Sequence, residues 1–254
     1  MIEELFGLKG KVALVVGASK GLGKTMALSL AGAGADVAVA SRSKSLIEQT
    51  RDEISDLGKK SMAVVTDIAK EEDIARMVDQ VVNEFKKIDI LVNNAGIYLP
   101  GMALEVTGED WDKTFSVNLK GFFLCCSMVG KHMVEKKSGK IINIASVLGK
   151  RAAQASSAYS ASKAAIIQLT RSLALEFAPY NINVNAIGPG WFETEMVEEE
   201  LSNPKTRKLF LKKTPLRRFG VPEDLGGAVI FLASKASDFM TGETIFIDGG
   251  ISIW

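Results

Sequence analysis

Cysteine and histidine are scarce in this chain of 254 residues, which has two cysteines and one histidine. Cys125 and Cys126 are adjacent in an apolar segment and have no other cysteine to pair with, so neither a disulfide framework nor a zinc site is expected there. We expect buried, reduced thiols instead. His132 lies near the end of a predicted helix, beside Lys131, and is expected to be a solvated helix residue. No bound metal is therefore expected.

An excess of charge of one sign is also missing, as are long apolar runs. The 31 basic residues nearly balance the 30 acidic ones, and the formal net charge of +1 gives no argument for a nucleic acid or an anionic membrane as partner. The first residues, MIEELFGLKGK, contain no apolar signal core, and no apolar run approaches the length of a membrane span. We expect a soluble, cytoplasmic protein.

Short apolar segments alternate with segments of helical periodicity along the chain. KVALVVG, ADVAVASRS, SMAVVTDI and IDILVNNAG have the composition of buried strands, and each is followed by a helical pattern. This alternation predicts parallel βαβ units with right-handed crossovers and helices on both faces of the sheet. No linker or internal repeat divides the chain, so residues 1–254 are predicted to form a single α/β domain of the doubly wound Rossmann type.

Residues 111–137, WDKTFSVNLKGFFLCCSMVGKHMVEKK, predict one long helix. Between Phe122 and Val129 this helix is apolar around most of its circumference. A helix of this kind is buried on more than one side. We therefore expect its outer side to meet a second subunit.

The segment 141–163 carries the residue types that proton transfer needs. IINIA has the pattern of a buried strand and brings Ser146 to its carboxyl end, and Tyr159 and Lys163 follow in a helix that is predicted to extend to about Phe177. Residues four apart share a helix face, and a cation near a phenol lowers the pKa of that phenol. A tyrosine tuned in this way exchanges a proton with an alcohol or ketone oxygen, which Ser146 would also contact. The pattern favours hydride-transfer chemistry.

Three glycines stand between the first strand and the first helix. Gly17, Gly21 and Gly23 occur in GASKGLG, with the spacing GxxxGxG. Glycine lets the backbone approach a pyrophosphate, whose charge a helix N-terminus favours. The alternative interpretation is that these glycines only form a tight strand–helix turn.

The end of the second strand indicates which dinucleotide is bound. This strand ends at Ser41 and Arg42 without a carboxylate, and Lys20 lies in the glycine loop. Two cations without an anion favour the 2′-phosphate of NADP(H) over NAD(H), which stays the alternative cofactor. The alternative interpretation is that Lys20 and Arg42 are solvated surface charges. Asp67, after the third strand, suits either the adenine amino group or a helix N-cap.

Taken together, these motifs resemble the short-chain dehydrogenase/reductase family. GASKGLG, NNAG at 93–96, Asn118, Ser146, YSASK and PGWFET at 189–194 occur in the order and spacing of that family. The resemblance covers nearly the whole chain. It implies a sheet of about seven parallel strands, an NAD(P) cofactor and a homotetramer or homodimer.

The resemblance also implies a role for each matched residue. Tyr159 would be the acid/base, Ser146 would position the substrate oxygen, Lys163 would lower the pKa of the tyrosine and hold the nicotinamide ribose, and Asn118 would support a water-mediated proton relay. The candidate cofactor-binding residues are Gly17, Ser19, Lys20, Gly21, Leu22, Gly23, Ser41, Arg42, Asp67, Ile68, Asn94, Ala95, Gly96, Tyr159, Lys163, Pro189, Gly190, Trp191, Phe192 and Thr194. Val16 departs from the family, which usually has threonine there.

The substrate is expected to be a small carbonyl compound or alcohol, and its class stays open. Residues 191–219 form a basic, irregular lid, which suits an anionic substrate. Several stretches resemble gluconate 5-dehydrogenases, which act on a keto sugar acid, whereas the general architecture equally resembles 3-oxoacyl-[acyl-carrier-protein] reductases. Apolar residues such as Tyr98, Met102 and Trp191 favour an acyl or bulkier cyclic ketone. A catalytically silent dinucleotide sensor is the alternative from a different class of function.

Overall fold

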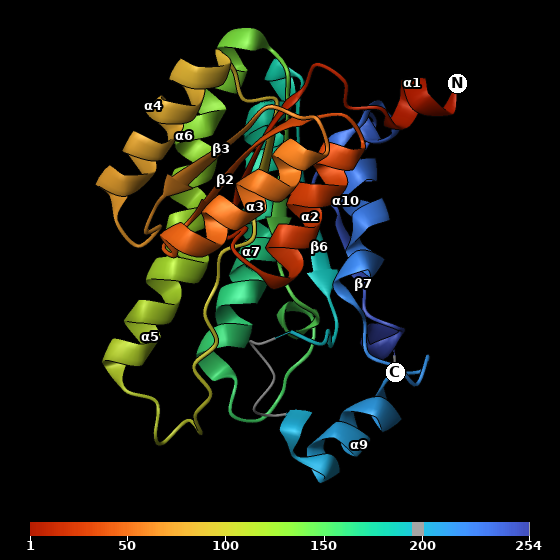
Figure 1. The fold of residues 1–254 in the computed structure, drawn as a ribbon. Helices are drawn as coiled ribbons and strands as arrows, with labels where there is room; N and C mark the ends of the chain where they lie inside the picture. The colour runs from red at the N-terminus through yellow and green to blue at the C-terminus, as the bar shows by residue number, and fades with distance from the viewer. Residues whose placement is uncertain (195–200, 254) are drawn as a thin grey trace.

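The core of the protein is a sheet of seven parallel strands in the order β3-β2-β1-β4-β5-β6-β7 (Figure 1). The computed structural model describes residues 1–194 and 201–253. The strands are β1 Val12–Val16, β2 Asp36–Ser41, β3 Ser61–Val65, β4 Ile90–Asn93, β5 Gly139–Ile144, β6 Ile182–Pro189 and β7 Thr244–Ile247. The predicted Rossmann-type fold is confirmed, including helices on both faces of the sheet.

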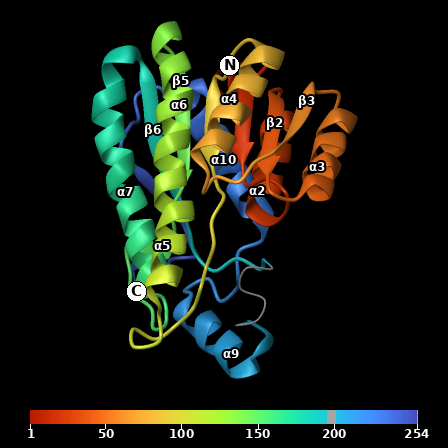
Figure 2. The same cartoon turned by 90° about the vertical axis from the view of Figure 1, so that its left-hand side faces the viewer.

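Each face of the sheet has its own apolar core, because successive side chains of a strand point to opposite faces. On β1, Leu14 belongs to the core under one helix layer, and Val15 belongs to the core under the other. The first layer contains α4 Glu71–Phe85, α5 Gly108–Phe115, α6 Gly121–Lys136 and α7 Ser157–Phe177. The second contains α2 Gly21–Gly32, α3 Lys44–Asp56 and α10 Gly226–Ala233. The two layers stand on either side of the sheet in Figures 1 and 2.

The strand order reverses at β1, which pairs with β2 on one side and with β4 on the other. In a doubly wound sheet the loops at the carboxyl ends of the strands separate at such a point and leave a crevice. The glycine loop follows β1, and the NNAG motif at 93–96 begins with the last residue of β4. Both motifs therefore meet at the crevice.

The helix predicted over residues 111–137 has a different internal form. It begins at Gly108 and ends at Lys136, and a π-helix over Ser116–Lys120 separates α5 from α6. Asn118 lies in this π-helix and is fully buried, with its side chain bonded to the main chain of Ile97. A π-helix adds one residue to a turn and is frequent at functional sites. The sequence pattern does not reveal this extra residue.

The lid contains more regular structure than predicted. Within the described part of 191–219, helix α9 spans Pro204–Lys213, so the prediction of an irregular segment was wrong there; residues 195–200 lie outside the described residues. Asn203 caps this helix by accepting hydrogen bonds from the main-chain N–H groups of Lys205 and Thr206, and proline stands at its first position. Asparagine followed by proline is a helix-start signal that the basic composition of the lid obscures.

Two short ends complete the architecture. Helix α1 spans Ile2–Phe6, and the chain forms a 3-10 turn at Ile251–Ile253 beside the carboxyl edge of the sheet. Further 3-10 turns lie at Val147–Gly149, Ala178–Tyr180, Pro222–Leu225 and Lys235–Ser237. Across the described ranges, no helix has both the length and the apolar character to span a membrane.

Candidate active site

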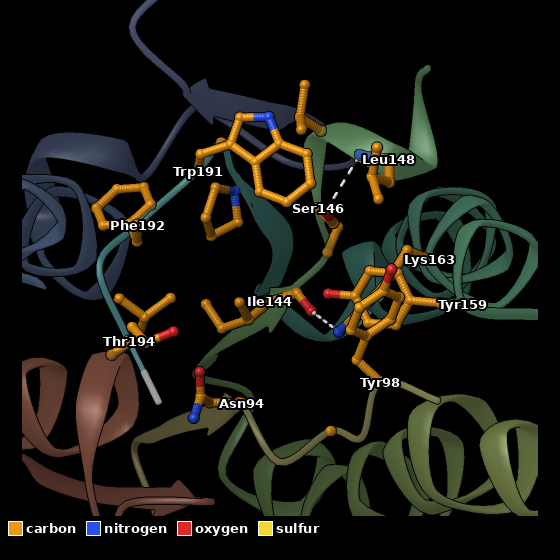
Figure 3. Close-up of a pocket in the computed structure, with 16 residues that line it drawn as sticks. Asn94, Tyr98, Ile144, Ser146, Leu148, Tyr159, Lys163, Trp191, Phe192 and Thr194 are labelled. Atoms are coloured by element: carbon orange, nitrogen blue, oxygen red, sulfur yellow. Dashed lines mark hydrogen bonds between the residues drawn. The ribbon is translucent and has the colours of Figure 1, made fainter. Parts of the chain in front are cut away.

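Ser146, Tyr159 and Lys163 line one cavity at the carboxyl end of β5 (Figure 3). Ser146 follows β5 directly and caps the next 3-10 turn, because its Oγ accepts a hydrogen bond of 3.1 Å from the N–H of Leu148. Tyr159 and Lys163 lie one turn apart in α7. The structure thus brings together the three residues that the sequence predicts to carry proton transfer.

Lys163 is held by the main chain at the end of β5. It is only 3% exposed, and its Nζ donates a hydrogen bond of 2.7 Å to the carbonyl of Ile144. The same atom lies over the ring of Tyr159, 5.7 Å from the ring centroid. Burial disfavours the charged ammonium and lowers the pKa of Lys163 to about 7.

The pKa of Tyr159 differs from the sequence-based expectation that Lys163 lowers it. Burial raises the pKa of Tyr159 to about 12, a hydrogen bond with Ser146 opposes this shift, and Tyr98 adds to it. The physical reason is that the Lys163 ammonium is bonded to a carbonyl and is itself desolvated, whereas burial acts directly on the phenolate. In this geometry the neutral, proton-donating form of Tyr159 is favoured at neutral pH.

Asn118 acts on the backbone beside the cavity. Its Oδ1 accepts a hydrogen bond of 2.8 Å from the N–H of Ile97, and its Nδ2 donates one of 2.9 Å to the carbonyl of the same residue. Nδ2 also lies 3.2 Å from the Oγ of Ser162. A Cβ on Gly96 would lie 3.4 Å from Asn118 Oδ1 and 3.7 Å from Lys163 Nζ, so these two side chains approach the same glycine. Asn118 lines neither cavity described here, and its predicted relay role stays a prediction.

The glycine loop is packed against the chain that follows β4. Gly17 has a φ of +85°, and a Cβ there would lie 2.4 Å from the main-chain nitrogen of Ala95. A Cβ on Gly23 would lie 2.0 Å from the carbonyl oxygen of Gly17, which accepts a hydrogen bond of 2.8 Å from Asn94 Nδ2. Packing therefore leaves no room for a side chain at either position, which agrees with both the pyrophosphate-binding and the tight-turn interpretation.

A second cavity extends from this loop to the end of β2, and it adjoins the catalytic cavity. The two share Leu22, Asn94, Gly96 and Thr194. The other predicted cofactor residues divide between them: Gly17, Ser19, Lys20, Gly21, Ser41, Arg42, Asp67, Ile68 and Ala95 line the second cavity, and Pro189, Gly190, Trp191 and Phe192 line the catalytic one. Gly23 lines neither and acts through packing. The continuous crevice, open at the N-terminus of α2, fits a nicotinamide dinucleotide.

Some lining residues escaped the sequence analysis. Ser43, Leu46, Ile97, Val117 and Glu193 line the second cavity, and Ile144, Ala145, Val147 and Leu148 line the catalytic one. Most of them directly follow or precede a residue that was predicted, so extending each motif by one or two positions would have found them. Leu46 is the exception, because it lies four residues beyond Arg42, inside α3.

The residues predicted to bind the adenosine end of a dinucleotide line the second cavity. Arg42 and Lys20 are exposed at its rim, and the strand end between them contributes the Ser41 hydroxyl and no carboxylate. Asp67 is not the N-cap of α4, since that position belongs to Lys70. One carboxylate oxygen of Asp67 accepts a hydrogen bond of 3.1 Å from the N–H of Ala69.

Aromatic side chains form the mouth of the catalytic cavity. Tyr98 meets Tyr159 edge to face, with ring centroids 5.2 Å apart. Trp191 stacks on Phe210 of α9, with centroids 4.1 Å apart and planes 10° from parallel. Among the residues that the structure describes, Lys163 is the only charged side chain that lines this cavity.

The basic lid residues lie outside the catalytic cavity. Arg207 forms an ion pair of 2.5 Å with Glu193, and Arg218 forms a two-pronged pair with Asp224 at 2.6 and 3.0 Å. The lysines of α9 are exposed, at positions 205, 208, 212 and 213. The lid thus presents charge to solvent and apolar rings to the cavity.

Comparison with known proteins agrees with this geometry. A family model described as enoyl-(acyl carrier protein) reductase matches residues 17–252. The chain is 40% identical over 253 residues to the 2-dehydro-3-deoxy-D-gluconate 5-dehydrogenase of Escherichia coli (strain K12), and the match covers 98% of both chains. It is 39% identical over 246 residues to the 3-oxoacyl-[acyl-carrier-protein] reductase of Thermotoga maritima, with 97% of this chain and 99% of the relative covered.

A solved structure shows the same architecture. The gluconate 5-dehydrogenase from Burkholderia cenocepacia J2315, solved in complex with NADP and tartrate, superposes with a TM-score of 0.97 at 35% identity and with 100% of both chains covered. The crevice of the present chain accordingly binds a nicotinamide dinucleotide. Sequence and fold together show that the chain belongs to the short-chain dehydrogenase/reductase family and is an oxidoreductase that interconverts ketones and secondary alcohols.

Proposed function

We propose that the protein is an NADP(H)-dependent reductase of a 3-oxoacyl thioester or a similarly apolar ketone. The observation that carries this proposal is the apolar lining of the catalytic cavity, which Tyr98, Leu148, Trp191 and Phe192 share with Tyr159. An acyl chain or ring gains free energy by burial against such side chains, whereas a polyhydroxylated acid would leave its polar groups unpaired. The exposed lysines of α9 would meet the phosphates of a thioester carrier.

A keto sugar acid is the second candidate. The similarity to the E. coli 2-dehydro-3-deoxy-D-gluconate 5-dehydrogenase and to the gluconate 5-dehydrogenase complex supports it. The cavity opposes it, because a carboxylate needs a cationic or multiply hydrogen-bonding partner, and Lys163, the one cation lining the described cavity, is bonded to Ile144.

The preference for NADP(H) rests on the end of β2. Arg42 and Lys20 line the cavity there, and the position that would hold a carboxylate to bond the ribose hydroxyls of NAD(H) is Ser41. The 2′-phosphate carries negative charge, so two cations at the rim favour it. Asp67 lines the same cavity, where it suits the adenine amino group.

The residues of the chain supply the proton in this reaction, and a bound nicotinamide exchanges the hydride. In the reductive direction Tyr159 donates its phenolic proton to the carbonyl oxygen, and its raised pKa keeps that proton in place at neutral pH. The Ser146 hydroxyl holds the same oxygen. Lys163, with a pKa near neutrality, would hold the nicotinamide ribose, and Asn118 would support re-protonation through water by fixing Ile97.

We also infer that the protein assembles as a homotetramer or homodimer and works in the cytoplasm. The outer side of the long helix supports assembly, because Trp111 is 40% and Phe123 is 46% exposed there. The two free, buried cysteines support a reducing compartment. Light scattering tests the assembly, and a monomer mass would contradict it.

The proposed substrate class is tested by comparing the turnover of three ketones. NADPH oxidation is measured with acetoacetyl-CoA, 5-ketogluconate and a cyclic diketone, and then repeated with NADH. We expect the thioester to give the highest kcat/KM and NADPH to exceed NADH. A higher kcat/KM for 5-ketogluconate would overturn the apolar-substrate proposal and leave the family assignment intact. Tyr159→Phe is the background control for each ketone.

A further inference from the structure

The segment from Ile97 to Gly101 is fastened at both ends beside the catalytic cavity. At one end, Asn118 bonds both main-chain groups of Ile97. At the other, the N–H of Gly101 donates a hydrogen bond of 3.0 Å to the carbonyl of Ala155, and Gly101 forms a β-bridge with Ser156. Between these anchors lies Tyr98, whose side chain points into the cavity beside Tyr159 (Figure 3).

The proton of the Tyr98 hydroxyl can be assigned from its neighbours. The oxygen of Tyr98 lies 3.1 Å from the Oγ of Ser156. Ser156 in turn lies 3.0 Å from the carbonyl oxygen of Gln154, which only accepts hydrogen bonds. A serine hydroxyl has one proton, so Ser156 donates to Gln154 and Tyr98 donates to Ser156. The proton of Tyr98 is therefore committed to Ser156, and toward the cavity its oxygen acts as an acceptor.

Ser156 links this bond to the catalytic residue. It is the N-cap of α7, it is buried, and its carbonyl accepts the first helical hydrogen bond, 2.8 Å from the N–H of Ser160. Tyr159 stands in the first turn of that helix. The ring of Tyr98 also packs edge to face on the ring of Tyr159, at 72° between the planes. Tyr98 thus touches Tyr159 directly through its ring and indirectly through the start of its helix.

We propose that Tyr98 is a positioning residue for the catalytic phenol, which it fixes through ring packing and through the hydrogen bond to Ser156. This proposal rests on the proposed acid/base role of Tyr159. Tyr98 does not give its own proton to the substrate, because that proton is bonded to Ser156. Its contribution is to hold the Tyr159 ring in one orientation and to present an acceptor oxygen to the cavity.

A second consequence concerns pH. Burial raises the pKa of Tyr159, a hydrogen bond with Ser146 lowers it, and the charge of Tyr98 adds a smaller raising effect. The titratable groups that line this cavity within the described ranges are Tyr98, Tyr159 and Lys163. Reduction requires protonated Tyr159 and is lost as the pH rises through its pKa. Removing the Tyr98 hydroxyl takes away the smallest of these causes, so we expect the alkaline limit of reduction to move slightly to lower pH.

The test uses two variants that each remove the hydrogen bond between Tyr98 and Ser156. Tyr98→Phe removes the tyrosine hydroxyl and keeps the ring, and Ser156→Ala removes the serine hydroxyl. With the ketone that shows the highest turnover, we expect each variant to lower kcat about fivefold and to leave the KM for the dinucleotide unchanged. The double variant should fall no further than about twofold below either single one, because one hydrogen bond is removed in all three. Tyr98→Leu, which also removes the ring contact, should lower kcat about tenfold further.

Tyr180→Phe is the matched control, since Tyr180 stands 40% exposed just beyond the opposite end of α7. It should keep wild-type kinetics. The proposal is overturned if Tyr98→Phe keeps a wild-type kcat, if only the KM for the ketone changes, or if the two single effects multiply in the double variant. Tyr159→Phe is assayed in parallel: wild-type activity there would refute the acid/base role itself, which separates the two failures.

Discussion

The two halves of the crevice are built in different ways. At the glycine loop, main-chain atoms form the wall. There is no room for a Cβ on Gly17 or Gly23, and the side chain of Asn94 donates a hydrogen bond to the carbonyl of Gly17. At the mouth of the catalytic cavity, rings form the wall: Tyr98 on Tyr159, and Trp191 on Phe210. Backbone geometry shapes one half, and the size and shape of side chains determine the other.

This difference decides what each half tolerates. A wall of backbone atoms admits little change, because an added methyl group meets another main chain at about 2 Å. A wall of side chains can be altered one ring at a time. The catalytic half can therefore adapt to different ketones without disturbing the glycine-loop half of the crevice (the cradle). The variants below test the contrast, from the largest expected effect to the smallest.

The largest effect is expected in the catalytic half of the crevice, at Tyr159. Tyr159→Phe removes the proton donor and keeps the ring on Tyr98, so kcat should fall about a thousandfold with dinucleotide affinity retained. Ketone turnover and a fluorescence titration with NADPH measure the two properties. Activity within tenfold of wild type would assign the proton to another group.

The next effect is expected at the adenosine end of the cradle. Arg42→Asp replaces a cation by an anion beside the proposed 2′-phosphate, and the NADPH/NADH ratio of kcat/KM should fall about a hundredfold. Arg51→Asp, at a half-buried arginine of α3 that pairs with Asp52, is the matched charge reversal and should leave the ratio unchanged. Equal ratios in both variants would show that Arg42 does not recognise the phosphate.

A methyl group in the cradle tests the backbone wall. In Gly23→Ala the new Cβ would lie 2.0 Å from Gly17 O and 2.4 Å from Asn94 Nδ2, so we expect a loss of about 2 kcal/mol and a Tm lowered by about 6 °C. Gly32→Ala, in the same helix, meets no atom within 4 Å and should be neutral or slightly stabilising. Differential scanning calorimetry compares the two, and similar Tm values would mean that the loop relaxes freely.

The smallest effect is expected at the side-chain wall. Phe210→Ala removes the ring that stacks on Trp191, so the KM for the preferred ketone should rise about fivefold with Tm and the KM for NADPH unchanged. Leu209→Ala, its exposed neighbour on α9, should keep the wild-type KM. If the KM for NADPH changes instead, the lid acts on the cradle rather than on the ketone.

The sequence predicted the fold and the close packing of the glycine loop because both leave periodic or local signals. Strand–helix alternation determines a parallel sheet, and glycines at a strand–helix turn mark close backbone approach. The spacing of Tyr159 and Lys163 placed them correctly on one helix face. These features depend on residues that are near each other in the chain.

The features that depend on distant partners were not predictable. The pKa of Tyr159 is raised rather than lowered, because Lys163 bonds a carbonyl of β5 and the phenol is desolvated. The stacking of Trp191 on Phe210 needs the position of α9, and the bond of Tyr98 with Ser156 spans 58 residues. Sequence spacing indicates which residues meet at the crevice, whereas packing determines the protonation state and the contacts of each residue.

The π-helix at Ser116–Lys120 has a consequence for insertions and deletions in this chain. It contains one residue more than an α-helical turn would need, and Asn118 reaches Ile97 from within it. Deleting a single residue here would give a regular α-helical turn, and the two flanking helices would keep their faces because the widened turn absorbs the extra residue. Asn118 would lose the widened turn from which it bonds Ile97, while α6 would keep its buried face against the sheet. A one-codon deletion in this turn should therefore act on the backbone beside the catalytic cavity and leave the fold in place.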